Sequence, residues 1–122
     1  MRGLYHSDHE GKYVVVTKRP VAYPIPYDGP VGEMLKATNR HPWRPAHVHF
    51  VVGAKGYDPV TTHIFDSVDS WLEKGDTVFG VKESLNVDFK EHEEATSAAK
   101  IYGVKAPFVT AEYDFVLGPE KK

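Results

Sequence analysis

The sequence predicts an all-β protein, and more closely an antiparallel β-sandwich with short helical turns and long loops. Short runs rich in β-branched and aromatic residues recur along the chain, and turn-forming residues separate them at close intervals. Segments with helical spacing are few and short. Many short strands with frequent turns are typical of sandwiches, so this is the architecture that we expect.

Composition and charge limit the functions that the protein can have. Its 122 residues fit one domain, so 1–122 is predicted to be a single domain with a buried core. Fifteen basic and seventeen acidic residues give a net charge of −2, which predicts no binding to nucleic acid or to a membrane surface. The chain has no cysteine, so thiolate metal sites are excluded. No long apolar run opens the chain, and a cytoplasmic enzyme is expected.

The first third of the chain is predicted to contain a hairpin, a stiff extended segment and a short helix. The hairpin is expected at 3–17, where polar residues separate two runs of strand-forming residues. Four prolines between Pro20 and Pro30 then exclude a central strand or a helix and favour an extended path. Apolar residues with helical spacing predict one or two helical turns at 31–38.

The next segment carries the strongest functional signal. In an extended strand, His47 and His49 project from the same face, so two imidazoles can bind one metal ion. Tyr23, on the proline-stiffened segment, can add a phenolate oxygen, and mixed nitrogen and oxygen ligands suit a trivalent metal such as iron better than a soft one. The alternative is that the two histidines lie on a solvated strand face and bind no metal.

The remaining elements follow from the same patterns. Strands are predicted at 60–65 and 108–117, with a turn at 53–59 before the first of them. A short helix is expected at 66–74, a brief strand at 78–81, and a solvated loop or frayed helix at 89–100. If the strand at 60–65 pairs with the strand of His47 and His49, then His63 lies beside them.

Two groups of motifs resemble a known protein family. The first group is Tyr23-Pro24-Ile25-Pro26, then Asp28-Gly29-Pro30-Val31-Gly32 and His41-Pro42-Trp43-Arg44-Pro45-Ala46-His47-Val48-His49-Phe50. The second group is Thr62-His63-Ile64-Phe65-Asp66 and Phe79-Gly80-Val81-Lys82-Glu83-Ser84-Leu85. Together they resemble the catalytic core of the intradiol ring-cleavage dioxygenases, and within that family the branch that cleaves hydroxyquinol.

The resemblance implies a non-haem Fe(3+) centre in a sandwich of antiparallel sheets. The metal would be bound by two tyrosines and two histidines, of which Tyr23, His47 and His49 match three. Tyr23 would also act as a base once the diol displaces it. Arg44 matches an active-site arginine that can stabilise negative charge developing on the substrate. Contacts with the substrate are implied for His63 and expected for three further residues: Tyr27, Phe79 and Gly80.

The implied reaction opens a catechol-type ring between two adjacent hydroxyl-bearing carbons. Dioxygen is the second substrate, and hydroxyquinol would give maleylacetate, as part of the catabolism of aromatic compounds. The resemblance also implies a second tyrosine ligand, farther upstream than the 22 residues before Tyr23, and an N-terminal helical segment through which such enzymes dimerise. We therefore expect this chain alone to bind iron weakly, and a homo-oligomer or a completing chain as its partner.

Two other functions remain open at this point. His47 and His49 could hold zinc on a β scaffold, as in cupins or carbonic anhydrases, although the acidic residue that cupins carry a few positions later is missing. The chain could also be an inactive or fragmentary domain of the same family that binds a catechol without consuming oxygen. Metal analysis and substrate titration separate these alternatives.

Overall fold

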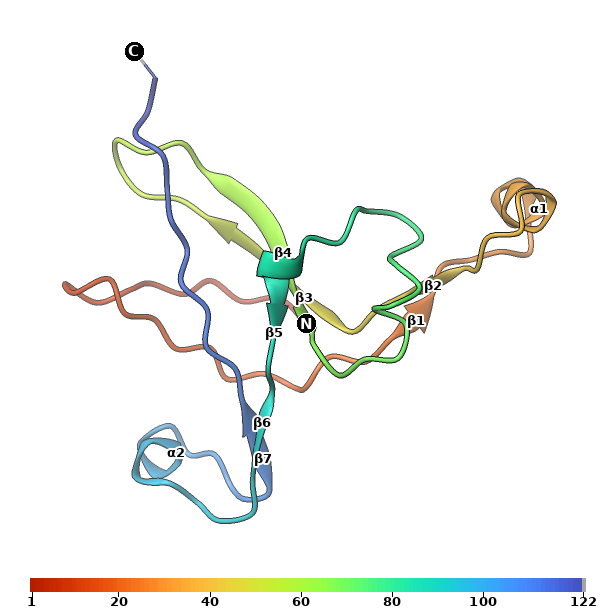
Figure 1. The fold of residues 1–122 in the computed structure, drawn as a ribbon. Helices are drawn as coiled ribbons and strands as arrows, with labels where there is room; N and C mark the ends of the chain where they lie inside the picture. The colour runs from red at the N-terminus through yellow and green to blue at the C-terminus, as the bar shows by residue number, and fades with distance from the viewer. Residues whose placement is uncertain (122) are drawn as a thin grey trace. The chain divides into compact units, whose positions relative to one another are not determined.

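The structure is a computed structural model that describes residues 1–121. It confirms the all-β prediction, because strands outnumber helices along the chain (Figure 1). The chain divides into two compact units, one formed by Met1–Arg19 with Lys90–Thr110 and the other by Pro20–Phe89 with the segment from Ala111 onward. The residues predicted to form the site belong to the second unit.

A hairpin of two long strands is the main feature of the second unit. Strand β3 (His47–Val52) pairs antiparallel with β4 (Val60–Asp66), and this confirms both predicted strands. The turn between them contains Gly56 with a φ of 82°, a left-handed conformation that glycine adopts without steric cost. Figure 1 shows β5 (Asn86–Val87) beside β4, with which it pairs in parallel.

The two faces of this hairpin carry different side chains. Because side chains alternate along a strand, the register places one polar and aromatic set on a single face: His47, His49, His63 and Phe65. Phe65 is completely buried and is part of the core. Phe50 lies on the opposite face, where its ring packs 4.9 Å from that of Phe115. The buried ring of Phe65 and the half-buried rings of Phe50 and Phe115 thus hold the strands that present the histidines.

The segment before the hairpin supplies Tyr23 and Arg44. Strand β1 (Tyr23–Pro24) pairs antiparallel with β2 (Trp43–Arg44), so these two residues lie opposite each other. Between them, α1 (Pro30–Ala37) confirms the predicted short helix. It begins at Pro30, where a helix does not need the missing N–H. The backbone carbonyl of Tyr27 packs directly on Gly32, with no room for a Cβ atom.

The first unit differs from its prediction. Strands β6 (Lys90–His92) and β7 (Phe108–Thr110) pair antiparallel, and α2 (Ser97–Ile101) lies between them in sequence. The predicted solvated loop or frayed helix at 89–100 is therefore part strand and part helix. The predicted turn in 3–17 is present, since the Asp8 carboxylate accepts hydrogen bonds from two backbone N–H groups. The predicted strands are absent from described residues 3–17.

Three other local predictions are also wrong. Residue 66 ends strand β4, and turns follow in 67–74 instead of the predicted helix, because the carboxylates of Asp66 and Asp69 accept hydrogen bonds from backbone N–H groups two residues later. Residues 78–81 are not a strand, and only Phe108–Thr110 of the predicted strand 108–117 is one. Within residues 1–121, no helix has both the length and the apolar character needed to cross a membrane.

Candidate active site

Three histidine rings gather on one face of the β3–β4 hairpin. The ring centroids of His47 and His49 lie 4.8 Å apart, and His63, opposite His49 on β4, lies 5.2 Å from it. Tyr23 reaches the same place from β1, with its ring centroid 5.6 Å from that of His47. The structure therefore brings the three predicted metal ligands together and places His63 beside them.

The surroundings of His47 leave one of its ring nitrogens free for a ligand. Nδ1 lies 2.6 Å from the carbonyl oxygen of Pro45, so this nitrogen carries the proton and donates it. Burial lowers the pKa of His47 below its usual 6.5, and the charge of Arg44 lowers it further, although the hydrogen bond to Pro45 opposes this. The ring is therefore neutral at pH 7, and Nε2 has the lone pair with which imidazole binds a metal.

Arg44 is buried beside Tyr23, so it is not the surface cation that an isolated arginine usually is. Its guanidinium donates from Nε and Nη2 to the carboxylate of Asp76, at 3.0 and 2.8 Å. Nη1 donates to the hydroxyl oxygen of Tyr23 at 2.9 Å. Burial alone would lower the pKa of Arg44, but the hydrogen bonds and charge of Asp76 raise it above its usual value. The site thus contains a permanent positive charge.

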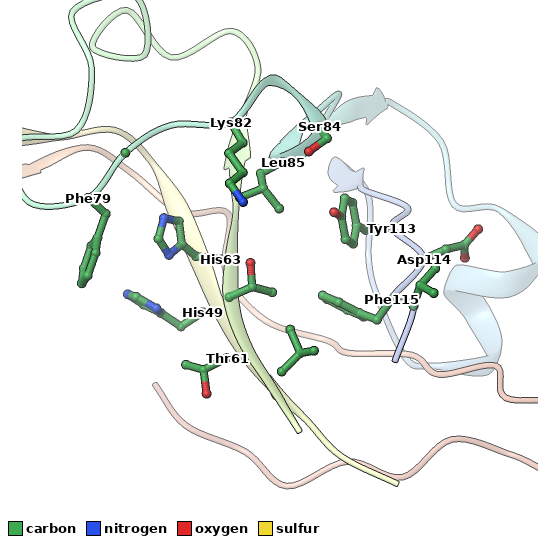
Figure 2. A pocket seen from close by; sticks show the side chains of 14 residues that line it. His49, Thr61, His63, Phe79, Lys82, Ser84, Leu85, Tyr113, Asp114 and Phe115 are labelled. Atoms are coloured by element: carbon green, nitrogen blue, oxygen red, sulfur yellow. The ribbon is translucent and has the colours of Figure 1, made fainter. Parts of the chain in front are cut away.

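An open cavity of about 520 Å³ adjoins these histidines. It is lined by His49 and His63, by the loop that begins at Phe79 and Gly80, and by the extended segment 113–116. Figure 2 shows the imidazoles of His49 and His63 on the same side of the hairpin as the ring of Phe79, which lies 5.5 Å from that of His63. Three of the four predicted substrate contacts therefore line the cavity.

The fourth predicted contact, Tyr27, lies elsewhere. Its side chain is 48% exposed next to α1, with the Lys36 amino group 6.0 Å from the ring centroid. It is not among the residues that line the cavity.

His63 has a free hydrogen-bonding atom at the cavity. Its Nε2 is buried and makes no hydrogen bond to any part of the described chain. Burial lowers the pKa of His63, and the neighbouring His49 and His47 lower it further, so the ring is neutral at pH 7. A neutral imidazole nitrogen without a protein partner can donate to, or accept from, the hydroxyl group of a bound molecule. The cavity is therefore suited to a hydroxylated ligand.

The donor atoms fit an oxygen-loving metal better than they fit zinc. Zinc sites use three or four ligands drawn mainly from His, Cys, Asp and Glu. Among residues 1–121, no group of three or more such side chains, the three histidines included, is arranged so that it could hold a metal ion. Tyr23 is the donor that can complete the pair of His47 and His49, and a phenolate oxygen with two imidazole nitrogens suits Fe(3+).

Sequence reasoning missed the partner of Arg44 and one wall of the cavity. Asp76 lies 32 residues after Arg44 in a loop with no periodic pattern, so no sequence signal joins the two. Tyr113 and Phe115 also line the cavity, and they are two residues apart, as side chains on one face of an extended segment are. No pattern in the sequence indicates that this segment lies beside the β3–β4 hairpin. Lys82 also lines the cavity, at the end of the loop that Phe79 begins (Figure 2).

Comparisons with known proteins agree with this geometry. The model of the family described as "Dioxygenase" matches residues 1–119. The chain is 48% identical over 121 residues to hydroxyquinol 1,2-dioxygenase of Rhodococcus opacus, and 44% identical over 117 residues to that of Rhizobium sp. (strain MTP-10005). The chain belongs to the intradiol ring-cleavage dioxygenase family. The predicted resemblance to this family is thereby confirmed.

A solved structure of the family has the same fold over the matched region. It is hydroxyquinol 1,2-dioxygenase from Pseudomonas putida DLL-E4, with a TM-score of 0.79 and 47% identity over 93% of this chain. That match covers 40% of the solved chain, and the two sequence relatives are covered to 40% and 39% of their length. The chain thus spans about two fifths of the intradiol dioxygenases that it matches.

Proposed function

We propose that the protein cleaves a catechol-type ring between two adjacent hydroxyl-bearing carbons, with hydroxyquinol as its substrate. One observation carries the proposal: Tyr23, His47 and His49 gather with the buried cation of Arg44, beside a cavity lined by His63, whose buried Nε2 has no hydrogen-bond partner among the described residues. Hydroxyquinol is the diol that we favour because the relatives with 44 and 48% identity carry its name.

Fe(3+) is the metal that we propose for this site, with Tyr23, His47 and His49 as ligands from this chain. When bound, it supplies the Lewis acidity that prepares the diol for reaction with dioxygen. His47 is the best prepared of the three, because its Nδ1–H is held by Pro45 and its Nε2 is free. Tyr23 is the oxygen donor whose position is fixed, since Arg44 donates a hydrogen bond to it.

The residues around the metal would handle protons and charge. The oxygen of Tyr23 would act as the base that takes up a proton from a substrate hydroxyl. Arg44 stabilises the negative charge that develops on the ring, and its burial strengthens this effect because water does not screen it. His63 forms a hydrogen bond with a hydroxyl group of the substrate. Phe79 and Gly80 form the wall against which the substrate ring packs. A contact between Tyr27 and the substrate stays a prediction.

For the whole protein, we also propose a product, an architecture and a partner. Both oxygen atoms of dioxygen enter the product, and hydroxyquinol becomes maleylacetate when the ring opens. We propose that the protein as a whole forms a β-sandwich around the site in a single domain, and that it works as a homo-oligomer or with a completing chain. A cytoplasmic location stays a prediction.

Oxygen uptake tests the proposed function most simply. The full-length protein is incubated with hydroxyquinol or catechol in an oxygen electrode, with iron measured in the same sample. We expect one dioxygen consumed for each diol opened, a ring-cleaved diacid as product, and a higher rate with hydroxyquinol. Binding of either diol without oxygen uptake in an iron-loaded sample would overturn the proposal and favour an inactive binding domain.

A further inference from the structure

We propose that Asp76 is a positioning residue of this site. It holds the guanidinium of Arg44 in one orientation, so that a single N–H group is directed at Tyr23 while the cation faces the cavity wall at Phe79. The proposal rests on the function proposed above and concerns a residue outside the metal ligands and the lining of the cavity.

The carboxylate of Asp76 determines which side of the guanidinium faces the site. The Asp76 side chain is completely buried, and that of Arg44 is 6% exposed. Oδ1 and Oδ2 accept hydrogen bonds from Nε and Nη2 of Arg44, a two-point contact that fixes the plane of the guanidinium. With Nε and one N–H of Nη2 held by Asp76, Nη1 donates to the hydroxyl oxygen of Tyr23 at 2.9 Å.

Asp76 is itself held firmly by the loop around it. Its Oδ1 accepts a hydrogen bond from the backbone N–H of Val78 at 2.8 Å. The backbone of Thr77 is fixed to β2, because its N–H donates to the carbonyl of Trp43 at 3.3 Å. The indole rings of Trp43 and Trp71 stack with centroids 5.0 Å apart and join the start of this loop to the same strand. The carboxylate is therefore anchored to the element that carries Arg44.

The same carboxylate also places the cavity wall. Phe79 follows Asp76 by three residues, and the guanidinium carbon of Arg44 lies 5.1 Å from the centroid of the Phe79 ring. The hydrogen bond from the Val78 N–H to Asp76 fixes the backbone directly before Phe79. A change at Asp76 would thus move both the cation and the aromatic wall, although Asp76 itself would not touch the substrate.

A purely structural role explains this arrangement less well. A buried ion pair contributes little net stability, because removing both charges from water offsets most of their attraction, and apolar residues of similar size often serve equally well. An apolar pair at positions 44 and 76 would leave no donor for the oxygen of Tyr23. The charges are therefore better explained by what Nη1 and the cation do at the site.

Asp76→Asn tests the proposal in the iron-loaded, full-length protein. The amide keeps an acceptor for the Val78 N–H but loses the charge and one acceptor for Arg44. We expect kcat for hydroxyquinol, per bound iron, to fall about 100-fold, the usual effect of a misplaced catalytic group. KM should change by less than about threefold, because the lost interaction acts on charge that develops after binding. Asp76→Glu should restore part of kcat.

Asp69→Asn is the matched control. Its Oδ1 accepts a hydrogen bond from the backbone N–H of Trp71 at 2.8 Å, as Asp76 does from Val78, and within residues 1–121 it forms no ion pair. This variant removes a carboxylate charge from a similar turn contact, keeps an acceptor for the Trp71 N–H, and should keep kcat. In an Arg44→Gln background, Asp76→Asn should cause no further loss, because the residue that it positions is already gone.

A second measurement does not depend on activity. In the metal-free protein, the Nε–H of Arg44 should give a slowly exchanging NMR signal, identified by its loss in Arg44→Gln. The signal should persist in Asp69→Asn and disappear in Asp76→Asn. An unchanged signal and kcat in Asp76→Asn would overturn the proposal, as would an equal loss of kcat in the Arg44→Gln background. If the wild-type protein opened no ring, the proposed function would fail, and the NMR signal would still decide whether Asp76 holds Arg44.

Discussion

Replacing Arg44 by methionine should destabilise the protein strongly at neutral pH. The substitution removes the cation and leaves the carboxylate of Asp76, whose side chain is 0% exposed, without its charged partner. Two charge-assisted hydrogen bonds are lost, each worth about 1.5–3 kcal/mol. Breaking one side of a buried ion pair costs about 3–5 kcal/mol, in agreement with that sum. We expect the free energy of unfolding to fall by about 3–5 kcal/mol.

The destabilisation caused by Arg44→Met should be smaller in acid. Burial by itself would raise the pKa of Asp76, yet the hydrogen bonds and charge of Arg44, with the backbone N–H of Val78, hold it below the usual 3.8. The stability that ionised Asp76 contributes in the wild type is therefore present above pH 3.8 and is lost as pH falls through the lower folded value. In Arg44→Met, burial raises the pKa of Asp76, so Asp76 becomes protonated at a higher pH than in the wild type. Once it is protonated, the variant no longer buries an unpaired charge.

Urea unfolding at about pH 7 and about pH 4 measures both effects. Arg40→Met is the control, because Arg40 is exposed and, among the contacts found in residues 1–121, its side chain donates only to the carbonyl of Thr77, at 2.7 Å. It should cost about 1 kcal/mol at either pH. A loss below about 1 kcal/mol in Arg44→Met, or a loss that grows in acid, would refute the reasoning, since the pair would then behave as a solvated one.

Two further predictions concern the frame of the site and its histidines. Gly32→Ala should destabilise the protein by about 1–3 kcal/mol in urea unfolding, because the new Cβ has no room against the carbonyl of Tyr27. The control, Gly53→Ala, should change the free energy of unfolding by less than about 0.5 kcal/mol. Equal effects of the two substitutions would show that the contact at Gly32 relaxes. In the metal-free protein, burial is the main cause that lowers the pKa values of His47 and His63. The stability that their neutral rings contribute is present above pH 6.5 and is lost as pH falls through the pKa values of the folded protein. Thermal unfolding between about pH 8 and about pH 5 should show this loss, and less of it in His63→Phe; a constant melting temperature would contradict it.

The sequence predicted the strands best where side chains are removed from solvent. Strands β3 and β4 lie where they were expected: alternate side chains of β3 are half-buried, and β4 ends in three buried residues, so a shift in pairing would expose apolar side chains. The hairpin at 3–17 failed for the opposite reason. Leu4 is 86% exposed, and Val14 and Val16 are 46% and 51% exposed, so no buried face fixes a pairing there.

The site could be predicted from sequence only in part. His47 and His49 are two residues apart on one strand, so the period of the strand alone brings them together. The position of His63 needed one correct pairing of neighbouring strands, and the sequence suggested it. Asp76 reaches Arg44 from a loop 32 residues away, and such a contact depends on tertiary packing that has no local signature. Tyr27 was predicted to contact the substrate; its ring lies near Lys36 of α1 and it is not among the residues that line this cavity, so the contact stays a prediction.

The claim that Tyr23 shares a ferric ion with His47 and His49 is tested most directly by iron content and visible absorption. Both are measured for the purified full-length protein, for Tyr23→Phe, and for Tyr57→Phe, a control whose side chain is 48% exposed against 44% for Tyr23. We predict a coloured protein with tyrosinate-to-iron charge transfer, a clear loss of that absorption and of iron in Tyr23→Phe, and no change in Tyr57→Phe. Iron content and a spectrum in Tyr23→Phe identical to those of the wild type would contradict the claim.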